Sequence, residues 1–190
     1  MQGIERIKPQ LKKTVASLLV LTLIVLTHNQ SLAYKSPMAL YNNILSKNPS
    51  SWFAYSNRGV LFFDQNDFLN ALNDLNHALA LKPANAEALS NRGSIFLRTG
   101  DFRRAISDFS DAVKYKPNFV RAYRNRGLAY TLTNQYDLAL KDFNRAIQIY
   151  PEYSDAYFSR GELFRRMGEM EEALNDFERS EAINSRRAKN

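Results

Sequence analysis

The residue types that most often do chemistry in proteins are scarce in this chain of 190 residues. It has no cysteine, which excludes disulfides, thiolate metal ligands and a cysteine nucleophile. Its two histidines, His28 and His77, supply too little material for the common metal clusters or for a histidine-based triad. We expect His77 to be an ordinary surface residue. The adjacent carboxylates Glu171 and Glu172 fall at a predicted helix start, where they interact favourably with the helix dipole.

Cofactor-binding patterns are also missing from the sequence. The seven glycines form no loop of the kind that cradles phosphate groups, and packing and turns account for most of them. We therefore predict that the chain is not an enzyme. We expect no catalytic residue, no cofactor, no metal site and no small-molecule substrate.

Charged residues follow a strict spacing instead. An Arg-Gly dipeptide recurs every 34 residues, preceded three times by asparagine and once by serine, and its arginines are Arg58, Arg92, Arg126 and Arg160. An aspartate follows each arginine by 16 residues, and these are Asp74, Asp108, Asp142 and Asp176. A fixed period between about 20 and 50 residues is typical of stacked repeat architectures.

Each copy of the repeat predicts two helices. Small and apolar residues share one face at helical spacing, as Ala88, Leu89, Gly93 and Phe96 do in the second copy. The residues between the two helices tolerate a left-handed backbone or cap the next helix, and they are Asn66-Asp67, Gly100-Asp101, Asn134-Gln135 and Gly168-Glu169. One helix pair cannot bury its apolar stripe alone, so the pairs must stack.

This pattern resembles the tetratricopeptide repeat over roughly Trp52 to Arg187. The resemblance implies an all-α, right-handed superhelical solenoid of four helix pairs with a leading half-repeat helix, about nine helices in all. The expected segments are a signal peptide at 1–33, a lead and capping half-repeat at 34–51, four repeats at 52–85, 86–119, 120–153 and 154–187, and a tail at 188–190.

The arginines and aspartates depart from that family's usual pattern, which has apolar residues at both positions. Because the two positions should meet across a helix pair, we predict four structural ion pairs: Arg58 with Asp74, Arg92 with Asp108, Arg126 with Asp142, and Arg160 with Asp176. The alternative is that the arginines reach into the groove and bind a ligand.

In tetratricopeptide arrays the concave face, lined by the first helix of each pair, takes peptides or helices of partner proteins. Asn57, Asn91 and Asn125 occupy equivalent places on that face. An amide both donates and accepts hydrogen bonds, so the three can hold a peptide backbone. The alternative is that they bond across neighbouring repeats.

Other candidate groove residues are basic or aromatic. A basic group made of Arg98, Arg121, Arg124 and Arg165 favours a ligand of acidic character. Three phenylalanines, Phe53, Phe63 and Phe158, are candidate apolar anchors or, equally, ordinary inter-repeat packing.

Residues 1–33 are typical of a secretory signal. A basic start precedes an uncharged apolar run from Thr14 to Thr27, and Ser31-Leu32-Ala33 forms a small-x-small cleavage site before Tyr34. The run is 14 residues long, and a stable membrane-spanning helix needs about 20. We expect cleavage, with an uncleaved anchor as the alternative. In either case the repeats lie outside the cytoplasm.

The sequence thus predicts a non-catalytic protein–protein interaction module, an adaptor or assembly factor, secreted or periplasmic. Its partner is another protein that presents a peptide or helix of acidic character. One alternative is a membrane-tethered scaffold that touches the membrane only through its N-terminal segment. The other is a basic-groove nucleic-acid binder, suggested by the net charge of +7. The export signal and the intermixed acids Glu87 and Asp155 count against it.

Overall fold

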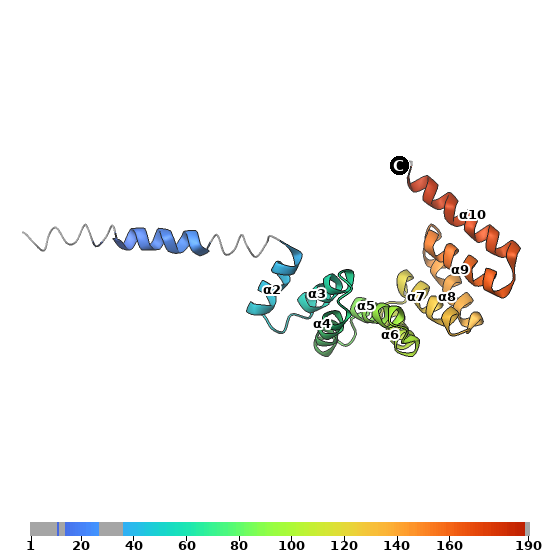
Figure 1. Ribbon diagram of the computed structural model, residues 1–190, viewed down its shortest axis with the longest axis horizontal. Helices are drawn as coiled ribbons and strands as arrows, with labels where there is room; N and C mark the ends of the chain where they lie inside the picture. Colours follow the sequence, from blue (N-terminus) through green and yellow to red (C-terminus); the bar gives the residue numbers. More distant parts are fainter. Residues whose placement is uncertain (1–10, 12–13, 27–35, 189–190) are drawn as a thin grey trace, which may run out of the picture.

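The computed structural model describes residue 11, residues 14–26 and residues 36–188. Residues 36–188 form a curved row of helices joined by short turns (Figure 1). In chain order the helices are α2 (Pro37–Lys47), α3 (Trp52–Asp64), α4 (Phe68–Leu81), α5 (Ala86–Arg98), α6 (Phe102–Tyr115), α7 (Val120–Leu132), α8 (Tyr136–Ile149), α9 (Ser154–Met167) and α10 (Met170–Arg187). The predicted all-α solenoid is confirmed.

Helices α3 to α10 form four pairs, each made of two consecutive helices in contact. Each pair also contacts the next, and the first helices α3, α5, α7 and α9 touch one another in turn. They therefore line one side of the solenoid. Across the whole row from α2 to α10, each helix contacts only helices one or two places away from it in the chain.

The turns within the pairs have the backbone that their residue types favour. Asn66 and Asn134 have φ angles of 60° and 58°, and Gly100 and Gly168 have 83° and 85°. All four are in the left-handed region, which asparagine and glycine tolerate best. The turns are therefore tight, and the two helices of a pair pack directly against each other.

A glycine in the first helix of each pair allows the second helix to approach closely. A Cβ atom added at Gly127 would lie 2.7 Å from Cε1 of Phe143, and one added at Gly93 would lie 2.9 Å from Cε1 of Phe109. Both phenylalanines are fully buried. The aromatic ring thus occupies the space that any larger residue would need.

The repeated arginines are used within the solenoid. Arg58 Nε and Nη2 donate to Asp74 Oδ2 and Oδ1 at 2.7 and 2.8 Å, and each of the other three predicted pairs has the same two-point geometry. The hydrogen bonds to Asp74 raise the pKa of Arg58. The arginine faces the second helix of its own pair, and the structure does not place it in the groove.

Each arginine has a third contact that sequence reasoning missed. Its Nη1 donates to a residue on the second helix before it, and these acceptors are Asn42, Asn76, Ser110 and Asn144. They recur with the same 34-residue period. Because Asn42 lies on α2, the leading half-repeat is joined to the first full pair in the same way as the later pairs are joined.

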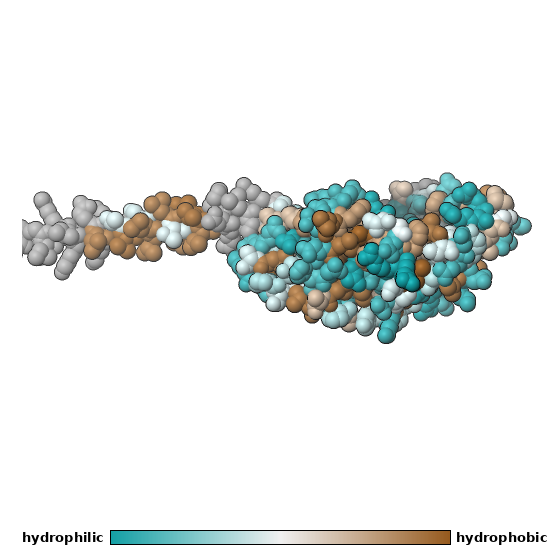
Figure 2. Space-filling view, turned by 60° about the horizontal axis from the view of Figure 1, so that its bottom comes forward, coloured by the Kyte–Doolittle hydropathy of each residue, from teal (hydrophilic) through white to brown (hydrophobic). Residues whose placement is uncertain are grey.

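The N-terminal apolar run is helical over residues 14–26, and its described side chains are exposed. Figure 2 shows this run as a hydrophobic stretch, whereas the repeat surface in that view is mainly hydrophilic with interrupted apolar patches. Among the described residues, no helix has the length and apolar character needed to cross a membrane. The proposed cleavage site and Tyr34 lie outside the described residues.

Candidate functional site

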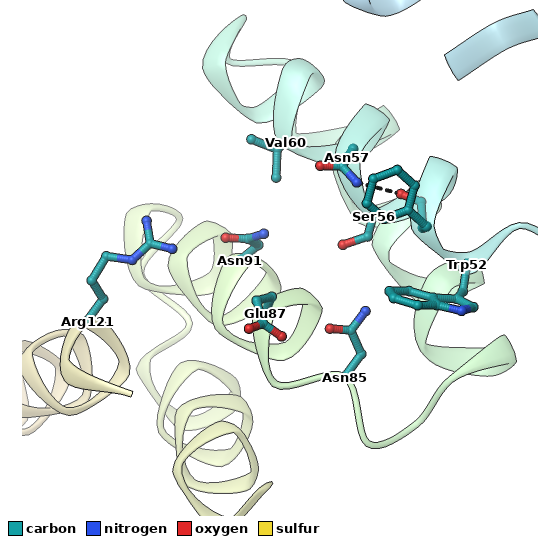
Figure 3. A pocket seen from close by; sticks show the side chains of 9 residues that line it. Trp52, Ser56, Asn57, Val60, Asn85, Glu87, Asn91 and Arg121 are labelled. Carbon is teal, nitrogen blue, oxygen red and sulfur yellow. Dashed lines mark hydrogen bonds between the residues drawn. The ribbon is translucent and has the colours of Figure 1, made fainter. Parts of the chain in front are cut away.

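The side of the solenoid formed by the first helices is hollowed between α3, α5 and α7. The hollow has a volume of about 390 Å³. Its lining residues come from three repeats and are Trp52, Phe53, Ser56, Asn57, Val60, Asn85, Glu87, Asn91 and Arg121. We call this hollow the groove pocket; Figure 3 shows the side chains around it. Of the predicted groove residues, the structure brings together Phe53, Asn57, Asn91 and Arg121.

One wall of the groove pocket is aromatic. Phe53 is 53% exposed, and its ring meets that of Trp52 edge-on with the centroids 6.0 Å apart. The ammonium group of Lys82 lies 3.7 Å from the centroid of the Trp52 ring. A cation over the indole face holds the ring in position. This wall can take an apolar side chain of a ligand.

The three equivalent asparagines have different partners. Asn57 donates to the Phe53 carbonyl at 2.8 Å, within its own helix. Asn125 lies outside the groove pocket and donates to Ser94 of the preceding repeat at 3.4 Å. Asn91 is half-buried and has no side-chain hydrogen bond within the described part of the chain. The three therefore do not form one uniform row, and Asn91 is the member whose side-chain amide has no hydrogen-bond partner among the described residues.

The charges of the groove pocket do not cancel. Glu87 accepts a hydrogen bond from Lys116 Nζ at 2.6 Å, and this bond lowers the pKa of the Glu87 carboxyl. Arg121 is exposed, lies 5.7 Å from the Phe119 ring centroid, and has no acidic partner among residues 36–188. The pocket therefore presents one compensated carboxylate and one uncompensated guanidinium.

The remaining basic candidates have partners of their own. Arg98 donates to Asn66 of the preceding repeat at 2.8 Å. Arg124 donates to Ser159 at 3.0 Å, and Arg165 forms an ion pair with Glu162 at 2.7 Å. None of the three lines the groove pocket. Their guanidinium groups thus donate to acceptors inside or between repeats, and of the three Arg165 is the one paired with a carboxylate.

Two of the three phenylalanine candidates also differ from Phe53. Phe63 packs on Phe68 at 5.9 Å between ring centroids and lies under the guanidinium of Arg98, so the structure uses it in packing. Phe158 on α9 is 52% exposed, and its ring centroid lies 5.5 Å from that of Phe177. It lies outside the groove pocket.

Asn85 and Trp52 were missed as groove residues. Both lie at the start of a first helix rather than on its inward face, so helical spacing did not select them. Asn85 is 4% exposed, and its Nδ2 atom has no hydrogen-bond partner in the part of the chain that the structure describes. The available signal was its place in the repeat, 34 residues after the helix-capping Ser51.

The other residues considered for chemistry lie apart from one another. His77 is exposed and stacks on the Tyr55 ring at 5.1 Å between centroids. Glu171 and Glu172 lie in the first turn of α10. No group of three potential metal-ligating side chains occurs within the part of the chain that the structure describes.

Fold and site together define a helical repeat protein with an open groove along its first helices. Two family sequence profiles match the chain. The one described as tetratricopeptide repeat matches residues 90–154 and 133–188, and the one described as TPR repeat matches residues 59–100. The chain belongs to the tetratricopeptide repeat family. Repeats of this family are protein–protein interaction modules.

Solved structures show the same fold. A crystal structure of MamA is 24% identical and has a TM-score of 0.71, with 80% of this chain and 90% of that chain covered. A MamA from Desulfovibrio magneticus RS-1 is 19% identical, with a TM-score of 0.72 and 84% and 92% covered. The TPR domain of Arabidopsis OM64 is 26% identical, with a TM-score of 0.59 and 61% and 96% covered. The comparison with curated protein sequences gave no match.

Proposed function

We propose that this protein is a non-catalytic adaptor or assembly factor that acts outside the cytoplasm and binds a segment of a partner protein in the groove pocket. The observation that carries the proposal is the composition of the pocket wall. An exposed aromatic ring, Phe53, lies beside three polar groups that have no hydrogen-bond partner among the described residues: Asn85 Nδ2, the Asn91 amide and the Arg121 guanidinium. Unpaired polar groups beside an apolar surface are typical of a binding site.

The proposal of a non-catalytic role rests on the same lining. Amides, one arginine, one hydroxyl and aromatic rings surround the hollow, and its single carboxylate is held by Lys116. A general acid or base needs an available titrating group close to a reacting centre. This lining is suited to holding a chain, not to moving protons.

Export is supported by residues 1–33. Their basic start, apolar run and Ser31-Leu32-Ala33 site direct the chain out of the cytoplasm, to the periplasm or the extracellular space. A tethered scaffold with an intact N-terminal segment is the second candidate. Both candidates use the same groove, because the anchor and the pocket are separate parts of the chain.

A pull-down from an extract of extracytoplasmic proteins tests the groove. The bait is the full chain with a C-terminal tag, compared with a groove variant carrying Phe53→Ala, Asn91→Ala and Arg121→Glu. The matched control carries Leu69→Ala, Asn73→Ala and Arg103→Glu. These are exposed residues of the second helices α4 and α6.

We expect mass spectrometry to find a protein held by the wild-type chain and the control but absent from the groove variant. Equal circular dichroism spectra and melting temperatures must show that all three baits are folded. Retention of the same protein by a folded groove variant would contradict binding in the groove pocket.

A further inference from the structure

We infer that the C-terminal end of the solenoid is a second interaction surface, which binds a basic amphipathic helix of another protein. We call this surface the end face, and its residues are Phe158 on α9 and Met170, Leu174, Glu178 and Glu181 on α10. These residues do not line the groove pocket. The inference therefore goes beyond the proposed function and stands or falls separately from it.

The apolar part of the end face is uncovered because α10 lies last in the row (Figure 1). The earlier second helices α4, α6 and α8 each contact their own first helix and the first helix of the next pair, whereas α10 contacts α9 alone among the described helices. Leu174 is 58% exposed, as are, to similar extents, Phe158 and Met170. Its equivalents in the earlier repeats are half-buried, and they are Leu72, Ile106 and Leu140. Exposed apolar side chains gathered in this way mark an interaction site.

Glu178 indicates the chemistry of the missing neighbour. It occupies the next place in the series of residues that each accept a hydrogen bond from an arginine of the following pair, namely Asn42, Asn76, Ser110 and Asn144. Glu178 is exposed and has no hydrogen-bond or ion-pair partner among the described residues. A carboxylate binds a guanidinium more strongly than an amide or a hydroxyl does, because the hydrogen bond is charge-assisted on both sides. The end face thus presents an acceptor suited to an arginine of another molecule.

The surroundings of Glu178 are acidic as well. Helix α10 has five acidic and three basic residues. Two of its arginines, Arg179 and Arg186, lie within ion-pair distance of Glu152, and Arg187 donates to the Glu152 carbonyl. Its basic residues therefore point toward the preceding turn, while Glu178 and Glu181 remain exposed. A partner on this surface needs positive charge.

A single helix fits the end face better than a further helix pair stacked in the regular way. Glu181 occupies the place of Leu45, Leu79 and Val113, all of which are buried. Regular stacking would bury the Glu181 carboxylate among apolar groups, at a large desolvation cost. Met170 and Leu174, one turn apart, form a short apolar stripe beside the acids. An amphipathic helix can cover that stripe and keep its basic residues at the edge, beside Glu178 and Glu181.

A second copy of the chain is a poor match for this surface. Two end faces placed together would bring Glu178 and Glu181 opposite the same carboxylates, and like charges repel. At the other end of the row, α2 has a single basic residue, Lys47. The charges therefore favour a different protein as the partner.

The test uses the full chain and a displayed library of 18-residue amphipathic helices. Leucines are fixed on one face, and every other position draws equally on Lys, Arg, Glu and Gln. The most enriched helix is synthesised with a fluorescent label, and its Kd is measured by anisotropy. The variants are Leu174→Ser and Glu178→Arg. The matched controls are Leu69→Ser on α4 and Asp111→Arg on α6, which replace an exposed leucine and an exposed carboxylate elsewhere.

We expect the enriched helices to contain more Lys and Arg than Glu. Leu174→Ser should weaken binding at least about 10-fold, because the contact of a buried apolar side chain is lost. Glu178→Arg should weaken it by a similar factor through repulsion, and 0.5 M NaCl should weaken binding to the wild-type chain. Both controls should bind as the wild-type chain does. The melting temperatures should stay unchanged, because both substituted side chains are exposed.

Three results would overturn the inference. The first is that no basic helix is enriched, and the second is that both variants, folded, bind as tightly as the controls. The third is a dimer in analytical ultracentrifugation that Leu174→Ser dissociates, because a second copy would then cover the end face.

The groove variant with Phe53→Ala, Asn91→Ala and Arg121→Glu separates this site from the groove pocket. It should bind the basic helix with the wild-type Kd, and loss of the helix from this variant, when folded, would contradict a site on the end face. If the pull-down finds no partner in the groove while the helix still binds, the proposed function fails and the end face stands.

Discussion

Arg126 on α7 and Asp142 on α8 form a two-point ion pair in which both N–O distances are 2.7 Å. Asp142 is 5% exposed, so the carboxylate depends on this partner for its charge compensation. Arg126 also donates to Ser110 on α6 at 3.1 Å. One guanidinium therefore joins two helices of its own pair and one of the preceding pair.

Replacing Asp142 by alanine should destabilise the protein strongly. Removal of one partner leaves the guanidinium half-buried and uncompensated, at a cost of about 2–4 kcal/mol. Urea unfolding followed by circular dichroism measures the change. The control is Asp111→Ala, an exposed carboxylate on α6, for which we expect less than about 0.5 kcal/mol. An unchanged unfolding midpoint for Asp142→Ala would show that the pair carries no stability.

Gly127→Ala should also destabilise, although alanine is the better helix former. The new Cβ would lie 2.7 Å from the Phe143 ring, and overpacking of this kind costs about 1–3 kcal/mol. In the first repeat the residue equivalent to Phe143 is Leu75. A Phe143→Leu change should therefore relieve part of the clash.

The double-mutant cycle of Gly127→Ala and Phe143→Leu measures that relief. We expect the two changes together to cost less than the sum of their separate costs. Strict additivity would place the strain somewhere other than the contact between residues 127 and 143.

The pair of Glu87 and Lys116 predicts a small dependence of stability on pH. The folded-state pKa of Glu87 is lowered, chiefly by the hydrogen bond from Lys116. The resulting stabilisation is therefore complete above the unfolded pKa, about 4.3, and is lost as pH falls through the lowered folded value. Because both side chains are largely exposed, we expect at most about 0.5 kcal/mol.

Comparison of the wild-type chain with Glu87→Gln at pH 7 and at pH 3 isolates this contribution. The difference in unfolding free energy should be present at pH 7 and should shrink at pH 3. A difference that grows on acidification would reverse the sign and rule out the pair as its cause.

The mature N-terminus should be Tyr34 if residues 1–33 are removed on export. Intact-mass measurement and N-terminal sequencing of the protein recovered from outside the cytoplasm test this directly. A chain that keeps Met1 and partitions with membranes would favour the tethered scaffold instead. Substitution of Ala33 by a bulky residue such as arginine should block cleavage and leave the uncleaved precursor.

The repeats and their ion pairs could be predicted because each occurs four times in the same phase. The position of Arg98 could not. It lies in the last turn of α5, over the turn of the preceding repeat, where Asn66 and Phe63 hold it. Helical spacing places a residue on a face but does not tell how far the neighbouring repeat overlaps that face.

The sequence could not predict, either, that Asn85 Nδ2 is buried without a hydrogen-bond partner among the described residues. A capping asparagine at the start of a helix predicts one hydrogen bond, the bond to Ala88. Whether its other half is buried depends on how Trp52 and α3 pack beside it. The burial of Nδ2 depends on how neighbouring helices pack, so residue spacing within one helix could not indicate it.

Within the helices α2 to α10, each helix contacts only helices that lie one or two places away from it in the chain. Low sequence separation of contacts favours fast folding, and a repeat array can start to fold from whichever part emerges first. A chain threaded through an export channel from its N-terminus could therefore complete α2, α3 and α4 before α9 and α10 appear. If the chain is exported as we propose, this architecture would let it become structured progressively on the far side of the membrane.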